Sequence, residues 1–267
     1  LTTMKNFYFN SFFLSDSFGK INKQFRAKNF VEIFLIGFLF TLPISSTAKS
    51  VFLALAVGSI LMKPSYWQPL NGILKEKWVI AICVYLSIVL IDCIFSSANI
   101  AEKFLVLGKY SKMLYLPILT VGFQDKKIRS KGLDAFLLAM FLTCFLSIIT
   151  YTGVVKIDWI NPDSVFRNHI MTGMMMSFAA YLSAFLYMKS QGVKRIVYIA
   201  MAIIFTYQNF FISQGRTGYF IYLLLAFLFF LQHFRIKLAL VSFVFALSFF
   251  LYHIIFAPVC MQVLIKL

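Results

Sequence analysis

Long apolar segments dominate this sequence and constrain its fold more than any other feature. A membrane-spanning helix needs about 20 predominantly apolar residues, and nine segments meet or approach that length. They cover approximately residues 30–47, 48–62, 78–96, 104–122, 133–152, 170–189, 195–213, 217–232 and 237–257. Within lipid, a helix satisfies its backbone hydrogen bonds internally. The sequence therefore predicts an all-α protein, a polytopic transmembrane bundle of about nine helices.

The first two of these segments are the weakest, and they come as a pair. Pro43 interrupts the first, and the second is short and lies between Lys49 and Lys63. We therefore expect a hairpin that spans the membrane imperfectly. Because the two form a pair, removing both from the count leaves the orientation of every later helix unchanged.

The composition agrees with a lipid environment. Apolar residues make up 61% of the chain and charged residues only 13%, which differs strongly from soluble domains. In a soluble protein the net charge of +16 would suggest nucleic acid, but the basic residues gather between the apolar segments. We interpret the charge as a topology signal and expect no nucleic-acid partner.

The basic residues also predict the orientation, because cytoplasmic loops retain Lys and Arg. With the amino terminus in the cytoplasm, 17 of the 25 basic residues fall on the cytoplasmic side. We predict a cytoplasmic segment over residues 1–29, a transmembrane domain over 30–257 and a short periplasmic tail over 258–267. The first long apolar run begins only near Phe30, so we expect no cleaved signal peptide.

The basic residues that break this rule are informative, because charge outside or within the bilayer needs a reason. Arg216 lies in Ser213-Gln214-Gly215-Arg216-Thr217-Gly218-Tyr219, where one predicted helix ends and the next begins. Glycines allow a ligand to approach the backbone, a helix N-terminus favours an anion, and a guanidinium matches phosphate oxygens. The segment therefore indicates a phosphate site, with an interfacial arginine that snorkels to lipid headgroups as the alternative.

Lys109 and Lys112 lie about one helical turn apart in the predicted span over 104–122. Two interpretations stay open for them. In the first, they form a structural ion pair with Asp92 of the preceding helix. In the second, they line a polar cavity that receives an anionic headgroup.

The outer loop before the span over 170–189 ends in Arg167-Asn168-His169, which could hydrogen-bond a sugar or a phosphate. The sequence contains no Ser-His-Asp arrangement, no HExxH and no CxxC, and the four cysteines lack metal-like spacing. We therefore expect neither a metal site nor a hydrolase.

In their order along the chain, these features resemble the O-antigen ligase and polymerase superfamily of polytopic membrane enzymes. The residues that carry the resemblance are Phe166-Arg167-Asn168-His169-Ile170 and Ser213-Gln214-Gly215-Arg216-Thr217-Gly218-Tyr219. In that family, an arginine in a Ser-x-x-Arg-Thr/Ser-Gly-like segment at a periplasmic helix end binds the diphosphate of the donor. The resemblance implies this role for Arg216.

The resemblance further implies a glycosyltransferase of the bacterial inner membrane. It would move a glycan from undecaprenyl diphosphate to a lipid A-core acceptor, with membrane lipid around it and without a metal or other cofactor. Arg216, Arg167 and Lys109 are the expected diphosphate-binding residues. Family ligases continue into a large periplasmic loop with a second arginine and the catalytic histidine, whereas this sequence stops soon after Pro258.

We therefore expect an incomplete and inactive product. No catalytic residue is identified, and His169 is the candidate base if the chain proves active.

Two alternative functions stay open. An O-antigen polymerase would use the same donor with another lipid-linked repeat as acceptor, and the sequence does not separate it from a ligase. A transporter or flippase would show broken helices and paired intramembrane charges in corresponding halves. Only Lys109, Lys112 and Asp92 point to a transporter, and they have no counterpart in the second half.

Overall fold

The computed structural model describes residues 28–153, 161–213, 215–233 and 248. Every regular element in these ranges is a helix, which confirms the all-α class for this part of the chain. The first 27 residues, nearly all of the predicted span over 237–257 and the predicted tail over 258–267 lie outside the described residues.

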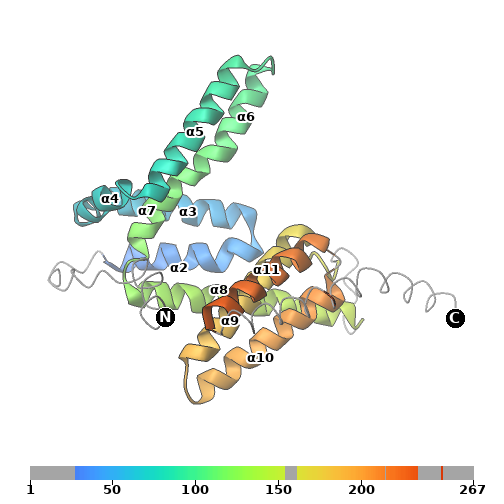
Figure 1. Cartoon of the computed structure of the whole chain (residues 1–267). Helices are drawn as coiled ribbons and strands as arrows, with labels where there is room; N and C mark the ends of the chain where they lie inside the picture. Colours follow the sequence, from blue (N-terminus) through green and yellow to red (C-terminus); the bar gives the residue numbers. More distant parts are fainter. Residues whose placement is uncertain (1–27, 154–160, 214, 234–247, 249–267) are drawn as a thin grey trace.

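The helices follow one another in the order shown in Figure 1. The α-helices are α2 (Lys28–Ile44), α3 (Ser46–Leu61), α4 (Trp67–Leu74), α5 (Lys77–Phe95), α6 (Ile100–Tyr110), α7 (Tyr115–Gly122), α8 (Lys126–Tyr151), α9 (His169–Lys189), α10 (Val193–Tyr207) and α11 (Arg216–His233). Three short segments connect some of them: the 3-10 turns η3 (Pro64–Tyr66) and η4 (Ser111–Leu114), and the π-helical turn η5 (Gln208–Ile212).

Five helical segments are long and apolar enough to cross a membrane. They are Lys77–Phe95, Ile100–Gly122, Lys126–Tyr151, His169–Lys189 and Val193–Ile212. The apolar parts of α2 and α11 are shorter. The chain is therefore a multi-pass helical membrane protein, and the count of nine spans stays a prediction.

The predicted span over 48–62 differs most from a straight transmembrane helix. α2 and α3 form the expected hairpin, and the hydroxyl of Ser45 caps α3 by accepting a hydrogen bond from the backbone nitrogen of Ala48 at 3.3 Å. After Leu61 the chain bends by 88° into the segment Pro64–Leu74. Proline has no amide hydrogen and clashes with a continuing helix, so Pro64 starts a new segment instead of extending α3.

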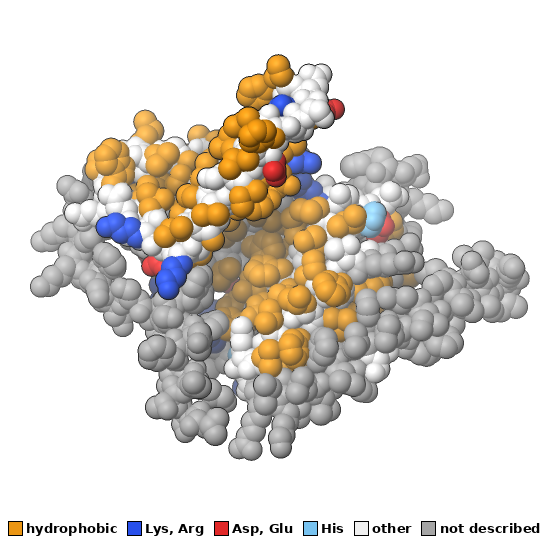
Figure 2. Space-filling model, turned by 45° about the horizontal axis from the view of Figure 1, so that its top comes forward, with side chains coloured by type: hydrophobic (Ala, Val, Ile, Leu, Met, Phe, Trp, Pro, Cys, Tyr) orange, Lys and Arg blue, Asp and Glu red, His pale blue; other side chains and the backbone are white. Residues whose placement is uncertain are grey.

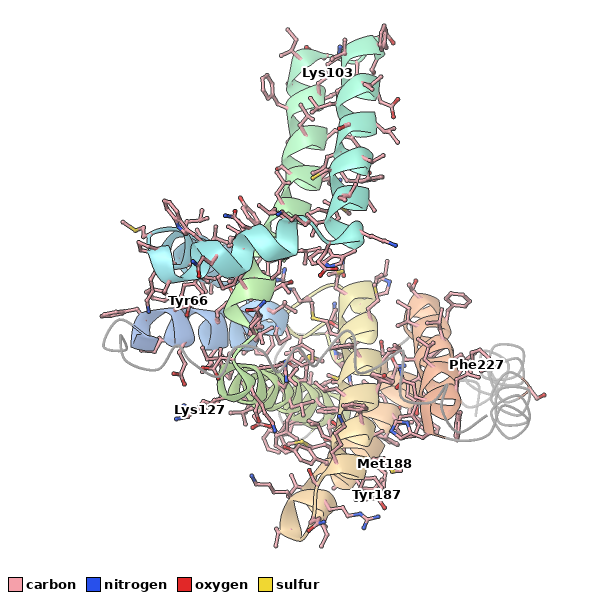
Figure 3. All side chains as sticks on the ribbon, turned by 60° about the vertical axis from the view of Figure 1, so that its left-hand side comes forward. Tyr66, Lys103, Lys127, Tyr187, Met188 and Phe227 are labelled. Atoms are coloured by element: carbon pink, nitrogen blue, oxygen red, sulfur yellow. The ribbon has the colours of Figure 1, made fainter. Side chains whose placement is uncertain are left out.

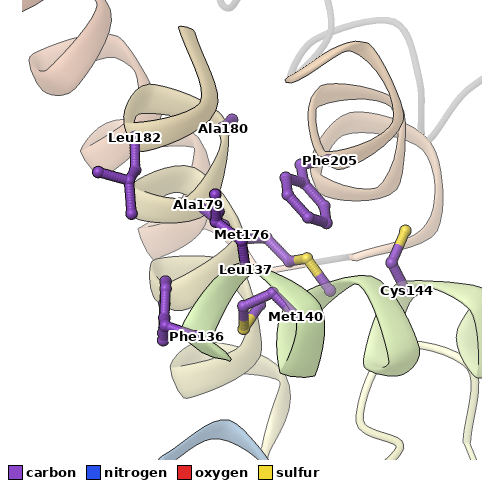
Figure 4. Packing of buried hydrophobic residues seen from close by; sticks show 9 residues of the cluster. All are labelled: Phe136, Leu137, Met140, Cys144, Met176, Ala179, Ala180, Leu182 and Phe205. Carbon is purple, nitrogen blue, oxygen red and sulfur yellow. The ribbon is translucent and has the colours of Figure 1, made fainter. Parts of the chain in front are cut away.

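The main core lies where α8, α9 and α10 meet (Figure 4). Phe205 of α10, Met176 of α9 and Met140 of α8 are almost completely buried there. Cys144 is also buried in this cluster, where it packs as a small hydrophobic residue. A second core around Leu35 joins α2 to α3 and α8. α8 contributes to both cores, so it connects α3 and α9.

The hairpin of α5 and α6 projects away from the other described helices (Figure 1). Apolar side chains cover its surface in the space-filling view (Figure 2), and Phe104, for example, is 70% exposed. A soluble domain rarely exposes an apolar surface of this extent. The surface therefore fits contact with lipid.

Candidate anion-binding site

The segment Arg167-Asn168-His169 leads into α9, and side-chain hydrogen bonds fix its backbone. Asn168 caps the helix, because its Oδ1 atom accepts a hydrogen bond from the backbone nitrogen of Met171 at 2.9 Å. Asparagine is one of the residues preferred at this position. The hydroxyl of Thr172 also donates to the carbonyl oxygen of Arg167 at 3.3 Å. The start of α9 is thus held in one conformation.

The second segment opens α11, and Arg216 is the first residue of that helix. The backbone nitrogen of Gly218 donates to the carbonyl oxygen of Gly215 at 2.9 Å. Tyr219 is buried, and its hydroxyl lies 3.0 Å from the carbonyl oxygen of Ser213, to which it donates. These bonds tie the start of α11 to the end of η5. The side chain of Arg216 lies outside the described part of the structure.

The N-termini of α9 and α11 lie side by side. A Cβ atom built on Gly218 would come within 3.0 Å of the Cα atom of Gly173 in α9. A Cβ atom built on Gly215 would lie 3.4 Å from the carbonyl oxygen of His169. α9 and α11 also contact each other farther along, toward their C-terminal ends. The two helices therefore run in the same direction and begin at the same end, so the two motifs found in the sequence come together.

This junction is electrostatically suited to an anion. Each helix N-terminus presents backbone amides without intrahelical partners and carries the positive end of the helix dipole. Two adjacent N-termini favour negative charge more than one alone. His169 is exposed at the junction, and its ring atom Cδ2 would lie 3.7 Å from a Cβ atom on Gly215. The site thus combines anion-binding amides with an exposed imidazole.

Arg167 joins this junction to the corner between α2 and α3. Its Nη2 atom donates to the carbonyl oxygen of Leu42 at 3.1 Å. Its Nε atom is buried and has no hydrogen-bond partner among the described residues. The carboxylate four residues earlier, Asp163, accepts a hydrogen bond from the hydroxyl of Ser164 at 2.9 Å. The guanidinium therefore retains a buried donor that a ligand could use.

Lys109 is the third expected diphosphate-binding residue, and the structure does not bring it to this junction. It lies exposed in the last turn of α6. No hydrogen bond or ion pair in the described ranges connects it to α9 or α11. Its role in binding diphosphate stays a prediction.

Lys112 lies in η4, and among the described residues it does not form the expected ion pair with Asp92. It lies instead within electrostatic range of Lys49 in α3. Asp92 lines a cleft of about 430 Å³ between α5 and α6, together with Glu102 and Lys103. The two lysines expected to act together therefore have different surroundings.

A buried polar network packs beneath the two helix starts, and the sequence interpretation missed it. The Nδ2 atom of Asn209 donates to the hydroxyl oxygen of Ser177 at 3.1 Å. That hydroxyl lies 2.8 Å from the carbonyl oxygens of both Gly173 and Gly218 and can donate to either. Asn209 and Ser177 are completely buried. They link η5 to the point where α9 and α11 touch.

The preceding residue, Gln208, extends this network toward α8. Its Nε2 atom donates to the hydroxyl oxygen of Ser147 at 2.6 Å, and Ser147 in turn donates to the carbonyl oxygen of Pro162 in the loop before α9. Gln208 and Asn209 both belong to the π-helical turn, a distortion that often occurs at functional sites. The signal in the sequence was two adjacent amides within the apolar segment 195–213.

Within the described ranges, no three His, Cys, Asp or Glu side chains come together as a metal site. No known protein family, curated protein or solved structure matches the chain. Function is therefore inferred from the chemistry of the junction itself.

Proposed function

We propose that this chain has the donor site of an O-antigen ligase-like glycosyltransferase of the bacterial inner membrane and binds an undecaprenyl-diphosphate-linked glycan there. The glycan would pass to a hydroxyl group of a lipid A-core acceptor at the periplasmic face. The observation that supports this most is the adjacency of two helix N-termini, at His169 and Arg216, with Arg167 nearby. Diphosphate fits such a junction because amides and guanidinium groups both donate hydrogen bonds to phosphate oxygens.

The proposed reaction makes one bond and breaks one. The acceptor hydroxyl oxygen bonds to the anomeric carbon of the glycan, and the bond from that carbon to the diphosphate oxygen breaks. Negative charge grows on the departing undecaprenyl diphosphate, where the helix amides and Arg216 would stabilise it. The proton of the hydroxyl group passes to a base. The exposed imidazole of His169 is the candidate base because it lies at the same junction.

An O-antigen polymerase would bind the same donor, so a test of donor binding applies to both enzymes. A transporter of the same lipid is the second candidate function, because the bent α3–α4 pair and η4 are interrupted helices of the kind found in transporters. Transfer of labelled lipid across a bilayer, without transfer of the glycan to an acceptor, would favour the transporter.

Donor binding can be measured on the whole chain in lipid nanodiscs with undecaprenyl diphosphate as the probe. Undecaprenol, which lacks the phosphates, should bind at least tenfold more weakly. Arg216→Ala should weaken binding of undecaprenyl diphosphate by about 10- to 100-fold, because a hydrogen bond to a charged group contributes about 1.5–3 kcal/mol. Arg216→Lys should recover only part of this loss, because an ammonium group cannot form the two parallel bonds of a guanidinium.

Arg195→Lys and Arg195→Ala provide the matched controls. Arg195 lies in the first turn of α10, and its Nη2 atom donates to the hydroxyl of Tyr187 near the far end of α9. Figure 3 shows Tyr187 and Met188 at the opposite end of the molecule from Lys103. Both control variants should bind the probe within about twofold of the unmodified chain. Equal binding by Arg216→Ala, or equal binding of undecaprenol, would refute the proposed donor site.

A further inference from the structure

Three basic residues from separate elements approach the corner between α2 and α3. The Nη2 atom of Arg167 donates to the carbonyl oxygen of Leu42 at 3.1 Å, which holds the guanidinium at the end of α2. Lys49 lies in the first turn of α3, the helix that Ser45 caps. Lys112 comes from η4, on the chain segment that continues into α7, and α7 packs against α3.

Among the described residues, Arg167 and Lys112 both place positive charge near Lys49. The electrostatic effects on Lys49 come from Arg167 and Lys112, and both repel its ammonium group. Lys49 is also partly buried, which makes an uncompensated charge costly. In the described part of the chain, the ion pair between Lys131 and Glu32 lies elsewhere, and it involves none of the three residues.

Two further features at this corner favour an anion from outside the chain. The Nε atom of Arg167 is buried and has no hydrogen-bond partner among the described residues. The N-terminus of α3 adds the positive end of a helix dipole. A phosphate group would accept hydrogen bonds from the guanidinium and would relieve the repulsion between the two lysines.

We propose that Lys49, Arg167 and Lys112 bind the phosphate group of an anionic membrane lipid at the corner between α2 and α3. A lipid is the favoured source because these elements belong to a multi-pass membrane protein, so lipid phosphates are present at high local concentration. The lipid site shares Arg167 with the proposed donor site at α9 and α11. Lys49 and Lys112 contribute to the lipid site alone, so each site can fail in experiment without the other.

The experiment uses the whole chain in nanodiscs of phosphatidylcholine, with or without phosphatidylglycerol. Phosphatidylglycerol should raise the melting temperature of the unmodified chain, because a ligand that binds the folded state stabilises it. Lys49→Gln and Lys112→Gln should each weaken retention of phosphatidylglycerol, measured by native mass spectrometry, by about fivefold. The double variant should lose the thermal stabilisation by this lipid.

The thermal measurement separates lipid binding from a folding defect. In phosphatidylcholine alone, Lys49→Gln should melt at or above the temperature of the unmodified chain, because it removes repulsion. Lys103→Gln is the matched control, since Lys103 lies at the far end of the α5–α6 hairpin (Figure 3) and should keep the response to phosphatidylglycerol.

Three results would overturn the lipid site. The first is an unchanged response to phosphatidylglycerol in the double variant. The second is stabilisation by inorganic phosphate in phosphatidylcholine nanodiscs that equals the effect of phosphatidylglycerol, because the ligand would then be free phosphate. The third is loss of undecaprenyl diphosphate binding in the double variant with lipid retention intact, which would assign the two lysines to the donor.

Discussion

Replacing Gly218 with alanine should force apart the starts of α9 and α11. The new Cβ atom would lie 2.8 Å from the Oδ1 atom of Asn209, 3.0 Å from the Cα atom of Gly173 and 3.2 Å from the carbonyl carbon of Gly173. Two of these three atoms belong to the backbone and cannot rotate away. The helices must therefore separate by several tenths of an ångström to restore ordinary contact distances.

The cost of this separation can be estimated from two opposing effects. Overpacking at a close contact typically destabilises a protein by about 1–3 kcal/mol, whereas alanine is favoured over glycine within a helix by up to about 1 kcal/mol. Separation also lengthens the hydrogen bond between the hydroxyl of Ser177 and the carbonyl oxygen of Gly218, which is 2.8 Å. We expect the free energy of unfolding to fall by about 1–2 kcal/mol and donor binding to weaken with it.

Unfolding by a denaturing detergent, followed by circular dichroism, measures this change. Gly58→Ala is the matched control, because it is also a helical glycine and a Cβ atom there would meet no atom within 4 Å. The control should unfold at the same detergent fraction as the unmodified chain or at a higher one. If Gly218→Ala is as stable as Gly58→Ala, the close contact between α9 and α11 is refuted.

Two further predictions concern the buried network and the orientation of the chain. Asn209→Ala should lower the free energy of unfolding by about 1–3 kcal/mol in the same detergent titration, because the buried hydroxyl oxygen in α9 would lose the hydrogen bond that Asn209 donates to it. An unchanged unfolding midpoint would contradict the buried network. Reporter fusions at Lys127 and Lys194 should report the cytoplasm, and a fusion at Asp163 the periplasm. A periplasmic Lys127 would rule out both the orientation and the donor site at the outer face.

The helices themselves were largely predictable from the sequence. Long apolar runs leave a lipid-embedded backbone few options except a helix, and eight of the nine predicted spans overlap described helices. The breaks between helical segments were harder to predict from the sequence. Pro64 provides a signal for the bend after α3, but the 3-10 turn at Ser111–Leu114 contains no proline. Its position reflects packing against neighbouring helices, which an average of hydropathy does not contain.

The candidate site was predictable in part. Arg167, His169 and Arg216 were identified from the sequence, yet the adjacency of their two segments depends on a close contact between glycines in different helices. The hydrogen bond from Arg167 to Leu42 joins residues 125 positions apart, so no local pattern could reveal it. Asn209 was missed because two amides hardly change the average hydropathy of an apolar segment.

The parallel arrangement of α9 and α11 has a consequence for biosynthesis. The residue that begins α11 follows the residue that begins α9 by 47 positions (residues 169 to 216). At about 5–20 residues per second, a ribosome needs about 2–9 seconds to make this stretch. During that time α9 lacks the neighbouring helix that packs against its N-terminal end. A chain released before Arg216 would therefore carry α9 and α10 but would have no paired helix ends with which to hold a phosphate.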